Sequence, residues 1–292
     1  MSQLAQDVGA DAGTATGTVA IVLSWNDAEL VRDCLSRLAR SKPGPDHVVV
    51  VDNASETDVE SFYRSALPGV EIIRSRRNVG FAAAVNMAIL RAASLGARWV
   101  WLVNSDTEVE ADTLACLLSA AGADHATGMV APVLLDRHGQ VQAWGGGSAS
   151  LWTGISRHAR SEADRVDYLS GACLLVSMPM LGEVGGLDER YFFYWEDVDL
   201  SFRARAAGWH LVVADGCRVV HYEATSLGPW SSARWFRLFE GLALFLRMRA
   251  PLPGLALAVR LLHHSAAMVR HRRWRALRGA WRGAIAGWRD EC

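Results

Sequence analysis

Several features are missing from this 292-residue sequence, and each absence excludes a class of protein. The sequence contains no uninterrupted apolar run of about 18 residues, so we expect no transmembrane helix. The first seventeen residues have neither the basic nor the apolar segment of a signal peptide, and we interpret them as a disordered lead. No CxxC pair occurs, which indicates reduced, structural cysteines and a cytoplasmic protein. The five cysteines are Cys34, Cys116, Cys173, Cys217 and Cys292.

A strong overall charge is also missing, but the charge is unevenly distributed along the chain. The formal net charge is −1, so the chain as a whole lacks a basic excess, and we expect no nucleic-acid partner. From Trp230 onward, however, twelve arginines stand against three acidic residues, which gives this segment a charge of +9. A basic segment on an acidic body indicates an anionic surface as partner.

Short apolar runs alternate with helical patterns over the first 135 residues. The runs are rich in β-branched residues, as is typical of strands buried on both faces. Strands alternating with helices predict an α/β fold with a mostly parallel sheet, which binds ligands at the carboxyl ends of its strands. The motif GxGxxG is absent, so the sequence lacks a dinucleotide-binding fingerprint. The expected strands are 19–23, 48–51, 70–73, 99–103 and 130–134, and the expected helices are 28–40, 81–93 and 111–121.

The pattern changes after residue 135. We expect loops and short hairpins as far as residue 165, and only helices beyond Pro229. The chain is therefore divided into a lead over 1–17, an α/β domain over 18–228 and a basic amphipathic helical extension over 229–292. The later elements expected are strands at 168–176, 210–213 and 218–221, and helices at 197–207, 230–249, 252–270 and 271–288.

Two polar segments are placed where a nucleotide could bind. Asp52 and Asn53 end an expected strand, where they can hydrogen-bond a nucleobase edge or simply form a turn. Asn78 and Gly80 follow two arginines and precede an expected helix, so this segment is either an anion site or a capped loop. Both alternatives are open for each segment.

Three further residues are candidates for a metal site. Asn104 and Asp106 follow an expected strand, and oxygen ligands at this spacing can hold Mg²⁺ or Mn²⁺ against a diphosphate. The alternative is that Asp106 or Thr107 caps the helix expected near residue 111. His221 ends a short apolar strand. A lone histidine there is more often structural, and it becomes a candidate ligand only if it lies near Asp106.

An aromatic run over 191–195 leads directly into three acidic residues, Glu196, Asp197 and Asp199. Acidic residues are common in the first turn of a helix because they complement the helix dipole. That explanation accounts for the acids but not for the aromatic run before them. An apolar wall would desolvate a carboxylate, raise its pKa and make it a better general base.

Taken in order, these motifs resemble those of a family-2 glycosyltransferase with a GT-A fold, and in particular the bacterial rhamnosyltransferase branch. The resemblance spans roughly residues 18–228 and leaves the basic extension uncovered. The matching segments are VLSWN at 22–26, VVVDNAS at 49–55, NVGFAAAVN at 78–86, WLVNSDTEV at 101–109, SGACLLV at 170–176, VGGLDERYFFYWEDVDLSFRARAAGW at 184–209 and VVHYEATS at 219–226.

The resemblance implies a role for each matching residue. Asp106 would bind the metal, although Asn104 stands where many family members have the first Asp of Asp-x-Asp. Asp197 would be the general base of a Glu196–Asp197 pair, and His221 would ligate the metal or contact the diphosphate. The residues implied to form the nucleotide-sugar site are Asp52, Asn53, Asn78, Gly80, Asn86, Asn104 and Trp195, with Gly171 and Ala172 beside the acceptor.

The function implied by the resemblance is inverting, metal-dependent glycosyl transfer with Mg²⁺ or Mn²⁺. The expected donor is dTDP-L-rhamnose, and the expected acceptor is a lipid-linked or other glycan of the cell envelope, or a secondary metabolite. We expect the pocket to form where strands end and not in the extension. One open alternative is the same chemistry with a UDP- or GDP-hexose donor. Another is a non-catalytic module that only binds a nucleotide-sugar.

The basic extension combines arginines with regularly spaced aromatic residues. Trp274, Trp281 and Trp288 are seven residues apart and therefore share one helix face. Amphipathic helices rich in arginine and tryptophan suit an anionic membrane surface, so we expect a peripheral protein at the inner face of the cell membrane. The alternatives are that the extension docks on the α/β domain or forms a homodimer interface.

Overall fold

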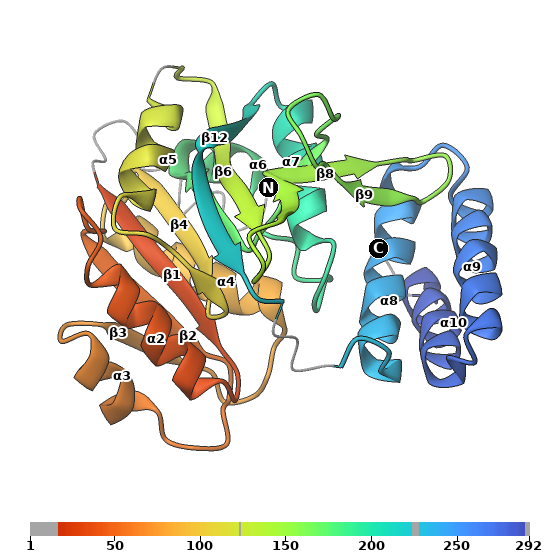
Figure 1. The fold of residues 1–292 in the computed structure, drawn as a ribbon, viewed down its shortest axis with the longest axis horizontal. Helices are drawn as coiled ribbons and strands as arrows, with labels where there is room; N and C mark the ends of the chain where they lie inside the picture. The colour runs from red at the N-terminus through yellow and green to blue at the C-terminus, as the bar shows by residue number, and fades with distance from the viewer. Residues whose placement is uncertain (1–16, 123, 224–227, 290–292) are drawn as a thin grey trace.

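The structure, a computed structural model, describes residues 17–122, 124–223 and 228–289 (Figure 1). The lead expected over 1–17 therefore lies outside the described residues except for Gly17, as does Cys292. The four described cysteines, Cys34, Cys116, Cys173 and Cys217, are all free. The α/β body and the three C-terminal helices lie side by side (Figure 1).

One half of the central sheet is parallel, as the alternation of strands and helices predicts. Its strands run in the order β3–β2–β1–β4, each parallel to its neighbours. Alternate residues of β1 face opposite layers: Val19 and Ile21 share a core with α4, whereas Ala20 and Val22 share one with α2. The bounds are β1 Thr18–Ser24, β2 His47–Asp52, β3 Glu71–Arg74, β4 Trp99–Asn104, α2 Ala28–Leu38, α3 Glu60–Ala66 and α4 Phe81–Ser94.

The other half of the sheet is mixed. β11 runs antiparallel to both β4 and β6, whereas β12 is parallel to β6 and antiparallel to β5. The full order is β3–β2–β1–β4–β11–β6–β12–β5, with β7 paired to β6. The bounds are β5 Thr107–Glu108, β6 Thr127–Leu135, β7 Val141–Trp144, β11 Cys173–Ser177, β12 His210–His221 and α5 Thr113–Ala121.

A small antiparallel sheet lies in the region where hairpins were expected. Its strands run in the order β10–β8–β9. Gly146 and Gly147 lie so close to the neighbouring backbones at Tyr168 and Arg157 that a side chain on either glycine would collide. The bounds are β8 Gly146–Ala149, β9 Ser156–His158 and β10 Tyr168–Leu169.

Three expectations about single elements differ from the structure. The strand expected over 168–176 is interrupted between β10 and β11, and this break is part of the site described below. The strands expected at 210–213 and 218–221 form the single strand β12, whose register shifts between Ala214 and Arg218. Helices α3 and α6 (Met178–Val184) were not expected, because seven residues are too few to give a clear helical pattern.

Three helices, α8 (Ser232–Arg249), α9 (Pro253–Arg270) and α10 (Trp274–Arg289), form the C-terminal part (Figure 1). Three glycines of α10, Gly279, Gly283 and Gly287, lie against the backbone of α8 so closely that a Cβ would collide with it. α8 also packs on the α/β body, since its apolar side chains share one core cluster with Tyr191 and Trp195. None of the described helices is both long enough and apolar enough to cross a membrane.

Candidate active site

The carboxyl ends of four parallel strands meet at one edge of the sheet. Ser24 at the end of β1 lies beside Asp52, and Asp52 in turn lies beside Arg74 at the end of β3. Asn104, the last residue of β4, is in register with Leu23 of β1. Polar side chains from four strands are therefore gathered at the edge where α/β folds bind their ligands.

Asp52 is completely buried at this edge. Its Oδ1 accepts a hydrogen bond from the Ser55 N–H at 2.9 Å, which is the turn that the sequence allowed. Its Oδ2 accepts no hydrogen bond from the described residues, although Nε of Arg74 lies 3.3 Å away. A cavity of about 420 Å³ opens beside this pair and is lined by Ala54, Ser55, Arg74, Ser75 and Arg76.

The side chain of Asn53 holds the loop that precedes α4. Its Nδ2 donates to Oδ1 of Asn78 at 3.0 Å and to the Gly80 carbonyl at 3.2 Å, and its Oδ1 accepts the Val79 N–H at 2.9 Å. Oδ1 of Asn78 also accepts the Gly80 N–H at 2.9 Å. The N–H groups of residues 79 and 80 therefore both bind protein side chains in this structure.

Gly80 is required by packing against the aromatic run. It has a φ of +89°, a conformation that residues with a side chain rarely adopt. A Cβ at this position would lie 2.6 Å from the carbonyl oxygen of Phe192. The same oxygen accepts the N–H of Phe81 at 2.7 Å. Gly80 therefore joins the start of α4 to the segment that leads to the acidic residues.

Asn86 is buried in α4 and holds a second loop. Its Nδ2 donates to the Leu187 carbonyl at 2.8 Å and to Oε1 of Glu189 at 3.0 Å. Its Oδ1 accepts the Leu187 N–H at 3.0 Å. Both polar atoms of the side chain thus have protein partners, and Asn86 holds the loop before the aromatic run.

The structure brings Asp106 and His221 together. Strand β12 pairs with β5, and Nε2 of His221 lies 3.5 Å from Oδ1 of Asp106. Nδ1 of His221 lies 2.8 Å from Oε1 of Gln142 on β7, while the Gln142 Nε2 donates to the His221 carbonyl at 3.4 Å. Since an amide oxygen only accepts, we assign the ring proton to Nδ1. Nε2 then presents its lone pair toward a carboxylate, an arrangement that a cation between them would stabilise.

These two side chains fit part of the coordination shell of a divalent cation. A carboxylate oxygen suits Mg²⁺ and Mn²⁺, and an imidazole nitrogen shifts the preference toward a transition-metal ion. Within the described ranges, no group of three or more His, Cys, Asp or Glu side chains could hold a metal. Phosphate oxygens and water would therefore have to complete the shell, as is common for Mg²⁺ in nucleotide sites.

The break between β10 and β11 connects this pair to Asp197. The Ala172 carbonyl accepts hydrogen bonds from the Asn104 N–H at 2.9 Å and from the Thr107 hydroxyl at 3.2 Å. These two donors flank the implied metal ligand in the sequence. The N–H of Gly171 donates to Oδ2 of Asp197 at 2.9 Å. One dipeptide, Gly171–Ala172, therefore joins the segment that carries Asp106 to the implied base.

Glu196 and Asp197 begin α7 (Glu196–Ala206), and both have raised pKa values. Glu196 is 6% exposed, and its Oε2 has no hydrogen-bond partner among the described residues. Burial, followed by the charge of Asp197, raises the pKa of Glu196 to about 8. Burial also raises the pKa of Asp197, but N–H groups of Gly171 and Val198 at 2.9 and 2.8 Å oppose this shift. Asp197 is therefore the member of the pair whose charged form is favoured by backbone N–H groups from two other residues.

Two members of the aromatic run, Tyr191 and Trp195, are buried against the C-terminal extension. Trp195 is 6% exposed, and its Nε1 donates to the Leu238 carbonyl of α8 at 3.1 Å. Its ring lies 5.1 Å from that of Phe245, also on α8, and Tyr191 is buried in the same cluster. Tyr194 and Trp195 both have positive φ angles, 75° and 76°, which is unusual for residues with side chains. Trp195 is thus a core residue that fixes the entry to α7 against the extension.

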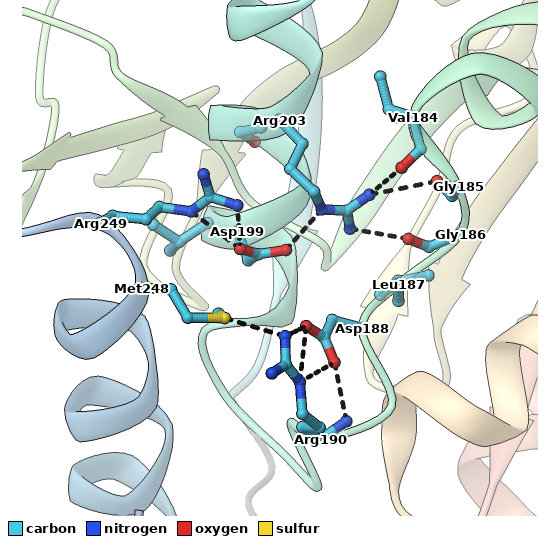
Figure 2. A network of polar contacts seen from close by, with 12 residues as sticks. Val184, Gly185, Gly186, Leu187, Asp188, Arg190, Asp199, Arg203, Met248 and Arg249 are labelled. Carbon is cyan, nitrogen blue, oxygen red and sulfur yellow. Dashed lines mark hydrogen bonds and ion pairs between the residues drawn. The ribbon is translucent and has the colours of Figure 1, made fainter. Parts of the chain in front are cut away.

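A buried charge network also ties α7 to the extension (Figure 2). Asp199 is 1% exposed, and its Oδ2 accepts Nε of Arg203 at 2.7 Å. Its Oδ1 accepts Nη2 and Nε of Arg249 at 2.6 and 3.0 Å. Arg203 also donates to three carbonyls of the loop 184–186, at 2.7 to 3.3 Å. Arg249 is the last residue of α8, so a buried ion pair ties the extension to the helix that carries Glu196 and Asp197.

Sequence reasoning missed three residues that organise this region. Asp27, at the start of α2, accepts the Ser105 hydroxyl through Oδ2 and the Trp25 N–H through Oδ1 at 2.9 Å. It therefore ties the loop after β1 to the loop after β4, and its position just before a helix was the only available signal. Gln142 and Arg249 lie 79 and 50 residues from their partners, so no local pattern could reveal them.

A larger cavity, of about 760 Å³, lies away from the predicted site residues. It is formed between the β8–β9 hairpin and the C-terminal half of α7. Its lining includes Trp152, Arg157, Phe202 and Arg205, and none of the residues implied to bind donor or metal. The arrangement at the strand ends, not cavity size, therefore locates the candidate site.

Comparison with known proteins supplies the family. A family model described as "Glycosyltransferase like family 2" matches residues 16–236. An N-acetylglucosaminyl-diphospho-decaprenol L-rhamnosyltransferase of Mycobacterium tuberculosis is 33% identical over 235 residues, covering 71% of this chain and 76% of that protein. A galactofuranosyltransferase of Mycolicibacterium smegmatis is 25% identical over 197 residues, which is 65% of each chain.

Solved structures share the fold at low sequence identity. A mannosyltransferase from Pyrobaculum calidifontis, in complex with GDP-Man and Mn²⁺, matches with a TM-score of 0.59 and 19% identity, covering 97% of this chain and 78% of that one. GalNAc-T7 with UDP, GalNAc and Mn²⁺ matches with a TM-score of 0.63 and 14% identity over 80% of this chain and 48% of that one. This chain therefore spans about half the length of GalNAc-T7. Together with the matching family model, these likenesses show that the chain belongs to glycosyltransferase family 2 and has the GT-A fold.

Proposed function

We propose that this glycosyltransferase moves L-rhamnose from dTDP-L-rhamnose to a hydroxyl group of a lipid-linked or other glycan, with inversion at the anomeric carbon. The observation that carries the proposal is the Gly171–Ala172 link between the segment that carries Asp106 and the candidate base Asp197. The sugar and the lipid-linked acceptor are supported by the 33% identical relative, whose name states an L-rhamnosyl group and a diphospho-decaprenol acceptor.

Asp197 is the proposed general base. Its carboxylate accepts the proton of the acceptor hydroxyl while the new bond to the sugar forms. The nucleoside diphosphate leaves from the opposite face of the sugar, so a single displacement inverts the configuration. The hydrogen bonds from Gly171 and Val198 orient the carboxylate and leave further lone pairs for the incoming proton. A neutral Glu196 beside it avoids a second negative charge.

Asp106 and His221 are the proposed ligands of Mg²⁺ or Mn²⁺. When bound, the ion would neutralise the charge that develops on the leaving diphosphate. Gln142 fixes the proton on Nδ1 of His221 and leaves Nε2 for the ion. Asn104 adds no charge to this pair, so we propose that the metal binds tightly only together with the nucleotide.

The nucleotide is proposed to lie along the carboxyl edge of the parallel strands. Arg74 lines the cavity and offers its guanidinium to the base, and the buried carboxylate of Asp52 lies 3.3 Å from that guanidinium. The neighbouring asparagines are proposed as positioning residues because their side chains already bind protein groups. These positioning residues are Asn53, Asn78 and Asn86, together with Gly80.

A panel of donors tests the proposal against its alternatives. The protein is incubated with dTDP-L-rhamnose, UDP-hexoses or GDP-hexoses, each with Mn²⁺ and a lipid-linked N-acetylglucosaminyl diphosphate, and products are identified by mass spectrometry. We expect transfer from dTDP-L-rhamnose to exceed the others by at least about tenfold. A preference for a UDP- or GDP-hexose would show that the proposed donor is wrong. Nucleotide binding without any product would favour the non-catalytic module.

A further inference from the structure

Helix α9 carries a continuous apolar stripe on its exposed side. Leu255, Val259, Leu262 and Val269 recur at intervals of three, four or seven residues and therefore lie on one face of the helix. All four side chains are exposed, and Leu262 reaches 65%. The opposite face is the one that is buried, through Ala256, Leu257, Leu261 and Met268 in the core shared with α8. Helix α9 is thus apolar on both sides, and only one side has a partner among the described residues.

The tryptophans of α10 extend this stripe. Trp274, Trp281 and Trp288 are all exposed and share one face of the helix, as their spacing predicts. Nε1 of Trp281 donates to Oγ of Ser265 on α9 at 3.1 Å. The ring of Trp288 lies beside Gly254 at the other end of α9. The exposed rings of α10 therefore border the exposed side of α9.

The charge on this surface has only one sign. Between Pro253 and Arg289 there are eight arginines and no aspartate or glutamate. Arg275, Arg282 and Arg289 each follow one of the three tryptophans directly, so a basic row runs beside the aromatic one. Apolar side chains next to a row of arginines are typical of helices that lie at a lipid–water interface.

We propose that this face of α9 and α10 docks on the surface of an anionic lipid bilayer, with Leu255, Leu262 and the tryptophans inserted among the lipids. The stripe would enter the interface while the arginines contact the lipid phosphates. A second copy of the chain is a poorer partner, because a symmetric dimer through this face would set arginines against arginines without a carboxylate. The inference concerns binding alone and holds whatever sugar the enzyme transfers.

Vesicle binding by the full chain tests this proposal. Partitioning is measured by co-sedimentation with vesicles of phosphatidylcholine alone and of an equimolar mixture with phosphatidylglycerol. We expect the anionic vesicles to bind at least about tenfold more protein, and added salt to weaken this binding. The double variant Leu255→Glu/Leu262→Glu should lose most of the binding. The matched control is Leu90→Glu, which alters a leucine of α4 that is 39% exposed. The control should bind as the unaltered protein does.

A second variant and a second measurement keep the outcomes distinct. Replacing Arg275, Arg282 and Arg289 by glutamine should abolish the preference for anionic vesicles, and thermal unfolding checks that each variant is folded. Equal binding to both vesicle types, or binding that the leucine variant does not reduce, would overturn the proposal. So would a dimer in sedimentation velocity that becomes a monomer in the Leu255→Glu/Leu262→Glu variant, because the face would then be a protein interface.

Discussion

At the residue scale, the main feature of the site is a pair of adjacent carboxyl groups, Glu196 and Asp197, whose surroundings differ. Two adjacent carboxylates in a buried first turn cannot both ionise without repulsion. Asp197 receives the N–H groups of Gly171 and Val198, whereas the only backbone N–H that favours the charged form of Glu196 is its own, so the surroundings favour the proton on Glu196. The two carboxyl groups titrate as a coupled pair. Because their surroundings differ, one can act as a base while the other stays neutral.

This assignment predicts how stability depends on pH. Folded protein keeps the Glu196 proton up to a pKa of about 8, whereas the unfolded chain releases it near 4.5. The folded state therefore binds more protons in this interval, so the free energy of unfolding falls as pH rises from 4.5 to 8. The contribution is largest below pH 4.5 and is lost through pH 8, with a slope of at most about 1.4 kcal/mol per pH unit.

Urea unfolding of wild type and Glu196→Gln between pH 5 and 8 measures this effect. Glutamine has no proton to lose, so the variant should lose less stability than the wild type as pH rises. The two curves should therefore converge or cross toward pH 8. Parallel curves across the whole range would show that Glu196 titrates normally in the folded protein.

Gln142 carries a second prediction at the same scale. Its side chain fixes the proton on Nδ1 of His221, so Gln142→Ala should leave Nε2 poorly oriented toward a metal. We expect the Mn²⁺ concentration for half-maximal activity to rise by about 10–100-fold. Electron paramagnetic resonance with nucleotide present measures Mn²⁺ binding directly. The control is Gln140→Ala, an exposed residue of the same hairpin, and equal metal affinity in both variants would refute the role of Gln142.

At the scale of elements, α7 is the part that joins the two halves of the molecule. Its first turn carries the acidic pair, while Trp195 before it and Asp199 within it both bind α8. Asp199 is neutralised by one arginine of its own helix and by another from the extension (Figure 2). Two arginines offset the cost of burying the negative charge of this carboxylate. Removal of one of them leaves much of that cost without an offset.

Arg249→Met should therefore destabilise the protein by about 3 kcal/mol, because it leaves Asp199 with a single cation. We also expect kcat to fall while the KM for the donor changes little. The variant should displace the general base Asp197 but not the edge of the sheet where the nucleotide is proposed to bind. Arg249→Lys should restore part of both losses. Arg64→Met, which breaks an exposed ion pair to Glu60 on α3, is the control and should change stability by less than about 1 kcal/mol. Equal effects of the two methionine variants on kcat would contradict the claim that α8 positions α7 through Arg249.

Elements with their own periodicity could be predicted from the sequence, and the rest could not. The strands β1, β2 and β4 are apolar runs between helical patterns, and the structure contains each of them. The break at Gly171 could not be seen, because YLSGACLLV is apolar at both ends and its interruption is set by Asn104, Thr107 and Asp197. These partners are distant in sequence, and only the assembled sheet brings them together.

At the scale of the whole molecule, the C-terminal extension and the α/β body share one core cluster. The core cluster around Phe239 and Phe245 includes Tyr191, Trp195 and Val198 of the α/β body. Docking of the extension on the body, which was the alternative to membrane contact, is therefore present through α8, while the exposed face of α9 and α10 lies outside this core. The extension both fixes the acidic helix and offers a separate surface.

The candidate site shows the same limit of sequence reasoning. The approach of Asp106 to His221 was a condition stated from sequence, and the 3.5 Å distance meets it. The roles of Asn53 and Asn86 could not be predicted, because their side-chain partners lie 25 to 103 residues away. A motif residue that lines a site and one that holds the lining loop look identical in sequence.

The central claim is that Asp197 removes the proton from the acceptor at a site where the nucleotide binds independently of it. The most direct measurement compares wild type with Asp197→Asn in sugar transfer and, by calorimetry, in binding of the donor nucleotide with Mn²⁺. The account predicts that transfer falls by about 10²- to 10⁴-fold while the nucleotide Kd changes by less than about threefold. Transfer at the wild-type rate, or loss of nucleotide binding together with transfer, would contradict it.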